Sequence, residues 1–282
     1  MIMKFLCLIL IFTSTTVFGK NFYRTNIYDV DYGLPGEEIL VLLGNGRVAK
    51  TNPDKTDYLY ILSESKRLKK ELGITLNKDR YIVSIEILSA STHSEFIPKE
   101  RNAAISTYIP TTISNMSTAQ KYHNKGRHSP KESQCFNRAL IWSYEWYKDH
   151  SLKSMHMFIF FTRNYIRTYN FEWWWHIAPY VHVMQEGKVV ERLMDIKYTR
   201  GPVTVRQWTD IFMRNDAQCR VVTKYSDYAD YPYTGDCYLM RTSMYYYQPS
   251  ELEMHEAWGF TKNNFKRDQL KEAYREAFDL GF

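Results

Sequence analysis

The chain has 282 residues, of which 44% are hydrophobic and 16% aromatic, so it can bury one large core or two smaller ones. Its formal charge of +6 is spread along the chain, and basic residues stand beside acidic ones. This distribution lacks the electrostatic footprint of nucleic-acid binding, so no nucleic-acid partner is expected.

The N-terminus resembles a secretory signal peptide. Lys4 precedes an apolar run over residues 5–12, and a short polar segment follows up to Gly19. This is the layout of a cleaved export signal, here residues 1–19. The apolar run is much shorter than the roughly twenty residues that span a bilayer. We therefore expect a secreted or periplasmic protein without a membrane anchor after cleavage.

Residues 20–88 are expected to form a small α+β domain. Its predicted elements are two strands, a helix and a third strand, at residues 37–44, 47–50, 52–72 and 79–88. Asn52 is the expected cap of the helix, and Gly73 is expected to close it. Residues 89–129 are rich in Ser, Thr, Asn and Lys without sustained periodicity, which is typical of a linker.

Residues 130–282 are expected to form a second α+β domain, in which a helix precedes an apparently antiparallel sheet. The helix begins at Cys135, and another follows Thr204, which forms a capping-box pattern with Gln207. A last, amphipathic helix is predicted near the C-terminus. The predicted strands lie at residues 155–163, 172–184, 188–196 and 237–247.

Three cysteines remain once residues 1–19 are removed, so at least one thiol has no intramolecular partner. Cys219 and Cys237 flank a polar loop that a disulfide could close in an oxidising compartment. The simplest arrangement pairs Cys219 with Cys237 and leaves Cys135 free. Other pairings stay open at this point.

Cys135 stands at the start of its predicted helix. A helix N-terminus and a nearby cation, here Arg138 one turn along, both stabilise a thiolate. A nucleophilic cysteine also needs a base, and the base needs an orienting group. A cysteine before an apolar helix is more often structural, so other residues have to decide its role.

His176 and His182 lie in an otherwise apolar predicted strand, where a polar ring requires a partner. If this strand pairs with the next one as a hairpin, Asp195 comes near His176 and could orient it as a base. Alone, His176 could equally be a buried structural histidine, and Asp195 could form a turn. A metal site built on the two histidines lacks further ligands in the sequence, so no metal is expected.

The order of these residues resembles the protein glutaminases, which are protein-glutamine deamidases. Three motifs carry the resemblance: Cys-x-x-Arg-Ala at a helix start, a strand with His-x-Ala, and an aspartate followed by Gly-Pro-Val-Thr-x-x-x-Trp. The matching residues are Cys135, Arg138, Ala139, His176, Ala178, Asp195, Gly201, Pro202, Val203, Thr204 and Trp208. The resemblance covers about residues 130–250.

Three features depart from the family pattern. Ile196 and Lys197 follow Asp195 where the family has Pro-Ser, which puts the geometry of this loop in doubt. The run Trp173–Trp175 before His176 is unusual and could reshape the cleft. The predicted C-terminal helix has no counterpart in the family motifs.

The resemblance implies a papain- or transglutaminase-like core in which Cys135, His176 and Asp195 form a catalytic triad. The implied reaction converts glutamine side chains of proteins to glutamate and ammonia through a thioester, without a metal or organic cofactor. The implied partners are proteins with accessible glutamines. The resemblance also implies that residues 20–88 are a pro-region removed by a maturation protease, with a permanent accessory domain as the alternative.

Other functions stay open on the residues alone. A Cys-His-Asp triad would also serve a cysteine peptidase or a transglutaminase-like acyl transferase. A non-enzymatic secreted binding protein could use Trp173–Trp175 as a contact surface. Alternation along a strand sends Trp173 and Trp175 to one face and Trp174 to the other, which favours core packing over a single binding platform.

Overall fold

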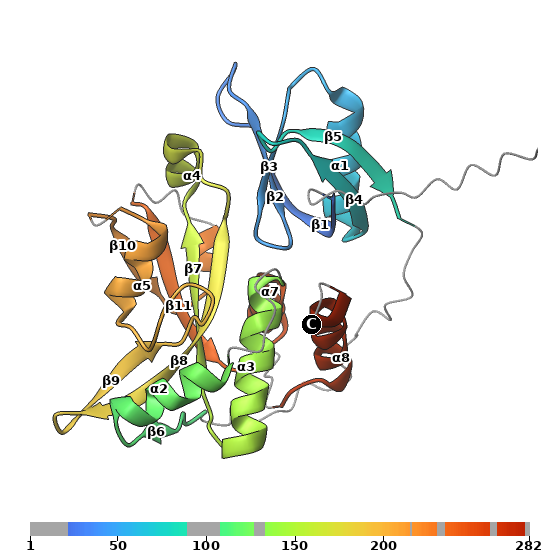
Figure 1. Ribbon diagram of the computed structural model, residues 1–282. Coiled ribbons are helices and arrows are strands. Elements are labelled where there is room, and N and C mark those ends of the chain that lie inside the picture. Colours follow the sequence, from blue (N-terminus) through green and yellow to red (C-terminus); the bar gives the residue numbers. More distant parts are fainter. Residues whose placement is uncertain are drawn as a thin grey trace, which may run out of the picture. The chain divides into compact units, whose positions relative to one another are not determined.

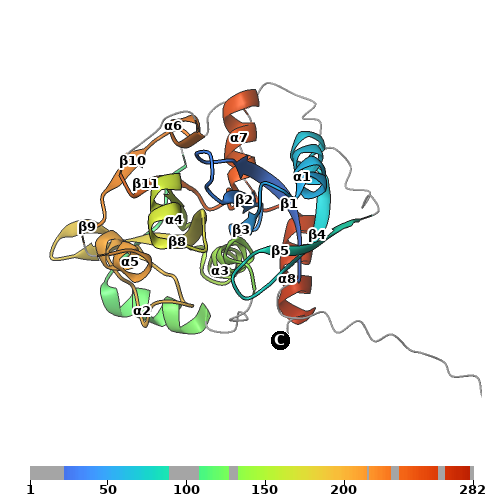
Figure 2. The same cartoon turned by 90° about the horizontal axis from the view of Figure 1, so that it is seen from above.

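The computed structural model describes residues 22–88, 108–126, 133–214, 216–229, 235–259 and 264–279 (Figure 1 and, turned by 90°, Figure 2). The predicted signal peptide, residues 1–19, lies outside the described residues, as do residues 89–107 and 127–129 of the predicted linker. Among the described helices, none has the length and apolarity that a membrane crossing requires.

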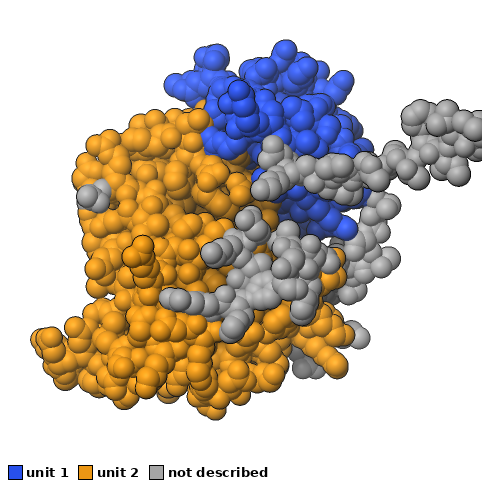
Figure 3. All heavy atoms as spheres, in the orientation of Figure 1, with its two compact units in different colours: residues 1–41, 49–91 blue, residues 42–48, 92–282 orange. Residues whose placement is uncertain are grey.

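The chain divides into two compact units (Figure 3). The first comprises residues 1–41 and 49–91, and the second comprises residues 42–48 and 92–282. The short segment 42–48 therefore belongs with the second unit, although it lies within the sequence of the predicted N-terminal domain.

The N-terminal region forms a five-stranded sheet with the strand order β3-β2-β1-β4-β5. Its strands are β1 (Phe22–Asp31), β2 (Ile39–Leu43), β3 (Val48–Thr51), β4 (Glu71–Leu76) and β5 (Ile82–Ile87). A single helix, α1 (Thr56–Leu68), packs against β1. The predicted strands at residues 37–44, 47–50 and 79–88 are present as β2, β3 and β5.

The helix α1 is shorter than the sequence predicts. It begins after Lys55 and not at Asn52, and it ends at Leu68 because Lys69 adopts a left-handed conformation with φ of 52°. Gly73 does not close the helix but lies inside β4, opposite Arg24 of β1. A Cβ at Gly73 would lie 2.8 Å from the ring of Phe22, so a close approach between strands explains this glycine.

The second unit is built on a mixed sheet with the order β10-β11-β7-β8-β6, and β9 also pairs with β8. These strands are β6 (Thr112–Ile113), β7 (Met155–Phe161), β8 (Trp175–Gln185), β9 (Lys188–Leu193), β10 (Cys219–Val222) and β11 (Cys237–Ser243). The pairs β11–β7, β7–β8 and β8–β9 are antiparallel as predicted. The short strands β6 and β10 instead pair in parallel with β8 and β11.

Helices surround this sheet, so the predicted α+β fold class is confirmed. They are α2 (Met116–Lys125), α3 (Cys135–His150), α4 (Arg163–Tyr169), α5 (Val205–Phe212), α6 (Ser226–Ala229), α7 (Pro249–Trp258) and α8 (Arg267–Asp279). The helix α3 begins at Cys135 as predicted and packs along β8. The helix α5 is preceded by the predicted capping box of Thr204 and Gln207.

The helix α2 lies within the segment predicted to be a linker. It is capped by Asn115, whose side chain accepts a hydrogen bond from the Thr118 N–H at 2.9 Å. Its buried Ala119 joins a hydrophobic cluster with Trp142 and Trp146 of α3. Residues 108–126 are thus part of the second unit, and their polar composition reflects the exposed side of α2.

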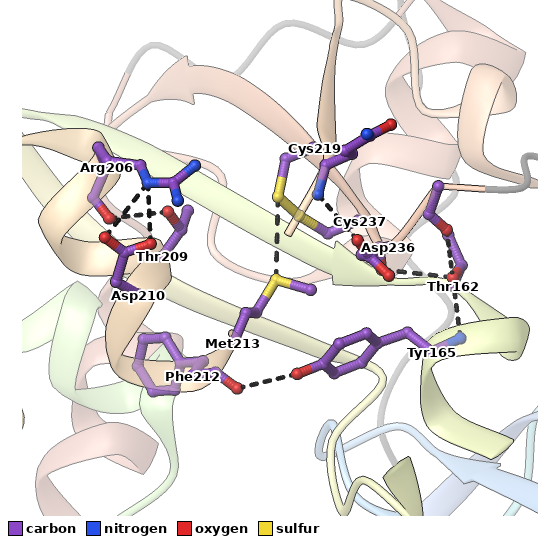
Figure 4. The surroundings of a disulfide bond; sticks show 12 residues. Thr162, Tyr165, Arg206, Thr209, Asp210, Phe212, Met213, Cys219, Asp236 and Cys237 are labelled. Carbon is purple, nitrogen blue, oxygen red and sulfur yellow. Dashed lines mark hydrogen bonds and ion pairs between the residues drawn. A yellow bond between two sulfur atoms is a disulfide. The ribbon is translucent and has the colours of Figure 1, made fainter. Parts of the chain in front are cut away.

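The predicted disulfide joins Cys219 to Cys237, which leaves Cys135 as the free cysteine among the described residues. The two bonded cysteines face each other on the parallel strands β10 and β11, with Cα atoms 4.4 Å apart. Figure 4 shows Met213, which follows α5, with its sulfur 3.8 Å from the sulfur of Cys219. The bond therefore joins two sheet strands close to the end of α5.

Candidate active site

Cys135 is the first residue of α3 and is buried. The helix begins here because Gln134 keeps an extended backbone (φ −63°, ψ 147°) while its carbonyl already accepts the Arg138 N–H at 3.1 Å. The free N–H groups of a helix N-terminus and its positive dipole end favour a negative charge. The backbone thus offers the thiol of Cys135 the environment that a nucleophilic thiolate requires.

His176 lies in β8, opposite Ile159 of β7, and its ring is buried. The ring Nε2 donates to the Asp195 Oδ2 at 2.7 Å. The other ring nitrogen, Nδ1, remains for Cys135, whose side chain is also a hydrogen-bond partner of His176. The structure therefore brings together all three residues that the sequence analysis selected.

The charges of these residues are coupled. Burial by itself lowers the pKa of His176, but the charge of Asp195 and hydrogen bonds to Asp195 and Cys135 outweigh it and raise the pKa to about 9. Burial raises the pKa of Asp195, but His176, Arg138 and Trp208 together lower it. At neutral pH the pair is therefore an imidazolium held against a carboxylate.

Asp195 lies two residues after the end of β9 and is held from several sides. Its Oδ2 accepts a second hydrogen bond, from the indole Nε1 of Trp208 in α5, at 2.9 Å. Its backbone carbonyl accepts the N–H groups of Tyr198 and Thr199 at 2.9 and 2.8 Å, so the chain turns sharply after β9. Ile196 and Lys197, which depart from the family pattern, lie within this turn.

His123 is a buried residue near the site that sequence reasoning did not select. Its Nε2 donates to the Thr199 hydroxyl at 3.0 Å, and this hydroxyl donates to the backbone carbonyl of Asp195 at 3.0 Å. His123 lies in α2, whose residues were interpreted as a linker. The cap residue Asn115 was the sequence signal that could have revealed this helix.

Aromatic rings surround His176. Those with ring centroids within 6.4 Å of the imidazole belong to Trp173, Tyr198, Trp208 and Phe212. Such a shell limits the access of water to the imidazole and strengthens its interaction with Asp195. His182, six residues further along β8, lies about 20 Å away from His176 at the usual rise of a strand and cannot share a metal with it. No cluster of three metal-ligating side chains occurs within the described ranges.

The tryptophan run before His176 has two structural roles. Trp174 and Trp175 are fully buried, as the core-packing interpretation expects. Trp173 is half-buried and lies between His176 and Arg47, whose guanidinium is 4.6 Å from the centre of the Trp173 ring. Trp174 and Trp175 therefore belong to the core, and Trp173 borders the candidate site.

The segment 42–48 runs alongside the residues that precede His176. The Trp174 N–H donates to the Gly46 carbonyl at 2.9 Å, and the Val48 N–H donates to the Glu172 carbonyl at 2.9 Å. The indole Nε1 of Trp174 also donates to the Leu43 carbonyl, at 2.7 Å. The segment thus pairs through its backbone with residues 172–174, which precede Trp175 and His176 in the chain.

Comparisons with known proteins agree with this geometry. A family model described as Glutaminase matches residues 111–212, which contain Cys135, His176 and Asp195. The fold is similar to a crystal structure of pro-protein-glutaminase, with a TM-score of 0.53 and 14% identity over 92% of this chain and 92% of that one. It is also similar to a mutant of pro-protein-glutaminase, with a TM-score of 0.51 and 16% identity over 82% and 86% of the two chains. The search of curated proteins found no match.

The chain thus has an α+β fold similar to that of pro-protein-glutaminase, and its residues 111–212, which contain the candidate site, match the glutaminase family model. The resemblance to the protein glutaminase family, which the sequence motifs predicted, is confirmed.

Proposed function

We propose that this enzyme deamidates glutamine side chains of protein substrates, with Cys135 as nucleophile, His176 as acid and base, and Asp195 as orienting group. The observation that carries the proposal is the hydrogen-bonded series of these three side chains at the N-terminus of α3. The match of residues 111–212 to the glutaminase family directs this thiol chemistry to a carboxamide.

In the first half of the reaction, the Cys135 thiolate attacks the carbon of the glutamine carboxamide. His176 is charged at neutral pH because its pKa is raised to about 9, so it can give its proton to the departing nitrogen. The C–N bond breaks, ammonia leaves, and a thioester joins the substrate to Cys135. Backbone N–H groups at the start of α3 would stabilise the oxyanion of the tetrahedral intermediate.

In the second half, neutral His176 takes a proton from a water molecule, which attacks the thioester. The C–S bond breaks, glutamate is released, and the thiolate–imidazolium pair is restored. Asp195 keeps the imidazole in one tautomer and orientation throughout, as the orienting carboxylate does in other triads. The net change is the addition of water and the loss of ammonia, and no cofactor takes part.

Residues 20–88 are proposed to act as a pro-region that keeps this site closed. The support is the pairing of segment 42–48 with residues 172–174, next to the Trp173 ring that contacts His176. Cleavage by a maturation protease in the part of the predicted linker before α2, within residues 89–107, would allow the segment to leave and would keep α2 with the second unit. Residues 1–19 are proposed to be removed earlier, as an export signal to the periplasm or the medium.

One assay distinguishes the candidate reactions. The chain, before and after limited proteolysis, is incubated with a folded glutamine-containing protein, and ammonia, new peptide fragments and incorporation of a labelled amine are measured together. We expect ammonia without fragments, a higher rate after proteolysis, and no reaction by Cys135→Ala. Fragments without ammonia would identify a peptidase, and amine incorporation would identify an acyl transferase. Partner binding without any reaction would identify a binding protein.

A further inference from the structure

The C-terminal helix α8 packs against α3, the helix that begins at Cys135 (Figure 2). The Tyr274 hydroxyl of α8 donates to the Glu145 Oε1 at 3.0 Å, and Ala273 is fully buried in the contact. Phe265, just before α8, makes ring contacts with Tyr144, Tyr147 and Tyr245 at centroid distances of 5.4, 6.1 and 5.0 Å. These contacts fix the position of α8 along α3.

The contact brings Glu276 of α8 to the N-terminus of α3. The backbone N–H of Gln134, which precedes Cys135, is a hydrogen-bond donor to the Glu276 carboxyl. The Glu276 Oε2 is buried and has no hydrogen-bond partner among the described residues. Burial raises the pKa of Glu276 to about 7. The hydrogen bond from Gln134 and the charge of Arg138 lower this pKa, but their effect is smaller than that of burial. The carboxyl group of Glu276 is thus bound to the backbone of Gln134, the residue that directly precedes Cys135.

Arg138 connects Glu276 to the triad. Its side chain is only 3% exposed, and its Nη1 donates to the Ser133 carbonyl. Its Nε is buried without a hydrogen-bond partner in the described part of the chain. The charge of Arg138 lowers the pKa of both Asp195 and Glu276, so the guanidinium is near enough to act on both carboxyl groups. A buried cation of this kind is costly unless negative charges balance it.

We propose that Glu276 is a positioning residue for the reaction at Cys135, because its carboxylate balances the buried charge of Arg138 and thereby limits how strongly that charge acts on the triad. The C-terminal helix thus contributes to the active site without touching the substrate. This inference rests on the proposed role of Cys135 as nucleophile.

The direction of the effect follows from the groups around both sites. His176 of β8, Arg138 of α3 and Tyr198 of the loop after β9 interact with Cys135 or with its partners. Arg138, Glu272 and Arg275 act on Glu276. Removing the Glu276 charge leaves the positive charge of Arg138 less compensated. The Cys135 thiolate is then favoured and the His176 imidazolium disfavoured.

The test measures alkylation of Cys135 by iodoacetamide as a function of pH in the full chain, followed by mass spectrometry of the Cys135 peptide. In Glu276→Gln, we expect the inflection of this profile at which His176 loses its proton, near pH 9 in the wild type, to fall by about half a pH unit. The matched control is Glu272→Gln, because Glu272 lies one turn earlier on α8, 57% exposed and paired with Arg275. This control is expected to keep the wild-type profile.

A second pair of variants separates charge from packing. Glu276→Met, also uncharged, is expected to shift the profile as Glu276→Gln does, and Glu276→Asp is expected to keep the wild-type profile. The proposal is overturned by an unshifted Glu276→Gln, by an equal shift in Glu272→Gln, or by an equal shift in Glu276→Asp. It is also overturned if both uncharged variants fail to fold while Glu276→Asp folds, since the carboxylate would then serve folding. Alkylation needs no glutamine, so the result is independent of whether the enzyme releases ammonia.

Discussion

The indole Nε1 of Trp208 and the Nε2 of His176 donate to one and the same carboxylate oxygen of Asp195, at 2.9 and 2.7 Å. Trp208 reaches Asp195 from α5, whose start the capping box of Thr204 and Gln207 defines. The final residue of the Gly-Pro-Val-Thr-x-x-x-Trp motif therefore has a physical role: it holds the carboxylate that orients the proposed base.

Replacement of Trp208 should lower kcat/KM by more than a loss of folding stability would explain. Trp208→Phe keeps an aromatic ring but removes a hydrogen bond to a charged group, which typically contributes about 1.5–3 kcal/mol. We expect kcat/KM for ammonia release to fall by roughly tenfold or more, with the melting temperature measured alongside. Trp146→Phe is the matched control, because Trp146 is a buried indole of α3 whose Nε1 has no hydrogen-bond partner among the described residues. An equal loss of kcat/KM in this control would contradict the role assigned to Trp208.

The pH dependence of activity should reflect the raised pKa of His176. Because the imidazolium loses its proton as the pH rises through about 9, kcat/KM for ammonia release is expected to decline above that pH. Asp195→Asn removes the charge that raises this pKa, so the decline should begin at a lower pH. The activity of this variant should also fall by about two orders of magnitude or more. A pH profile of Asp195→Asn that coincides with that of the wild type would contradict the proposed role of Asp195.

Gly46 offers a test of the proposed pro-region. Its φ is +91°, and an added Cβ would lie 3.1 Å from the Trp175 carbonyl oxygen and 3.3 Å from its Nε1. Gly46→Ala should therefore weaken the pairing of segment 42–48 with residues 172–174 and raise the ammonia release of the unprocessed chain several-fold. Gly36→Ala is the control, since Gly36 has a similar φ of +89° but nothing within 4 Å of an added Cβ. If the two variants show the same latent activity, the segment does not restrain the enzyme.

His156 should make the second unit sensitive to acid. Burial lowers its pKa to about 4, and its ring donates from Nδ1 to the Tyr246 carbonyl at 2.7 Å and accepts the Ser143 hydroxyl at 2.9 Å. A histidine with a lowered pKa in the folded state stabilises the fold above its unfolded pKa of about 6.5. This stabilisation, roughly 3 kcal/mol, is lost as the pH falls from there towards 4.

The measurement for His156 is the free energy of unfolding in urea at pH 7.5 and at pH 4.5. We expect the free energy of unfolding to decrease more from pH 7.5 to pH 4.5 in the wild type than in His156→Gln, because the glutamine side chain cannot take up a proton. Parallel losses in both proteins would show that other groups cause the acid sensitivity.

Features encoded within a few neighbouring residues could be predicted from the sequence. The helix that begins at Cys135, the capping box of Thr204 and Gln207, and the antiparallel strands β7, β8 and β9 are of this kind. They depend on local periodicity and on caps within one turn, which the chain carries directly. The order of Cys135, His176 and Asp195 was visible as well, through its resemblance to a known family.

What the sequence could not show depends on contacts between distant residues. The strands β6 and β10 have two and four residues, too few for a periodic pattern, and only the sheet decides that they pair in parallel. The helix α2 looks like a linker because much of its surface is polar, and its burial of His123 against Thr199 appears only after folding.

The site itself divides in the same way. The residue types and the spacing of the proposed triad were determined by the sequence alone. The double hydrogen bond to Asp195 and the approach of Glu276 to Gln134 were decided by tertiary structure, because each depends on where a separate helix packs. The charges that tune the proposed nucleophile therefore come from long-range packing, which no local pattern in the chain encodes.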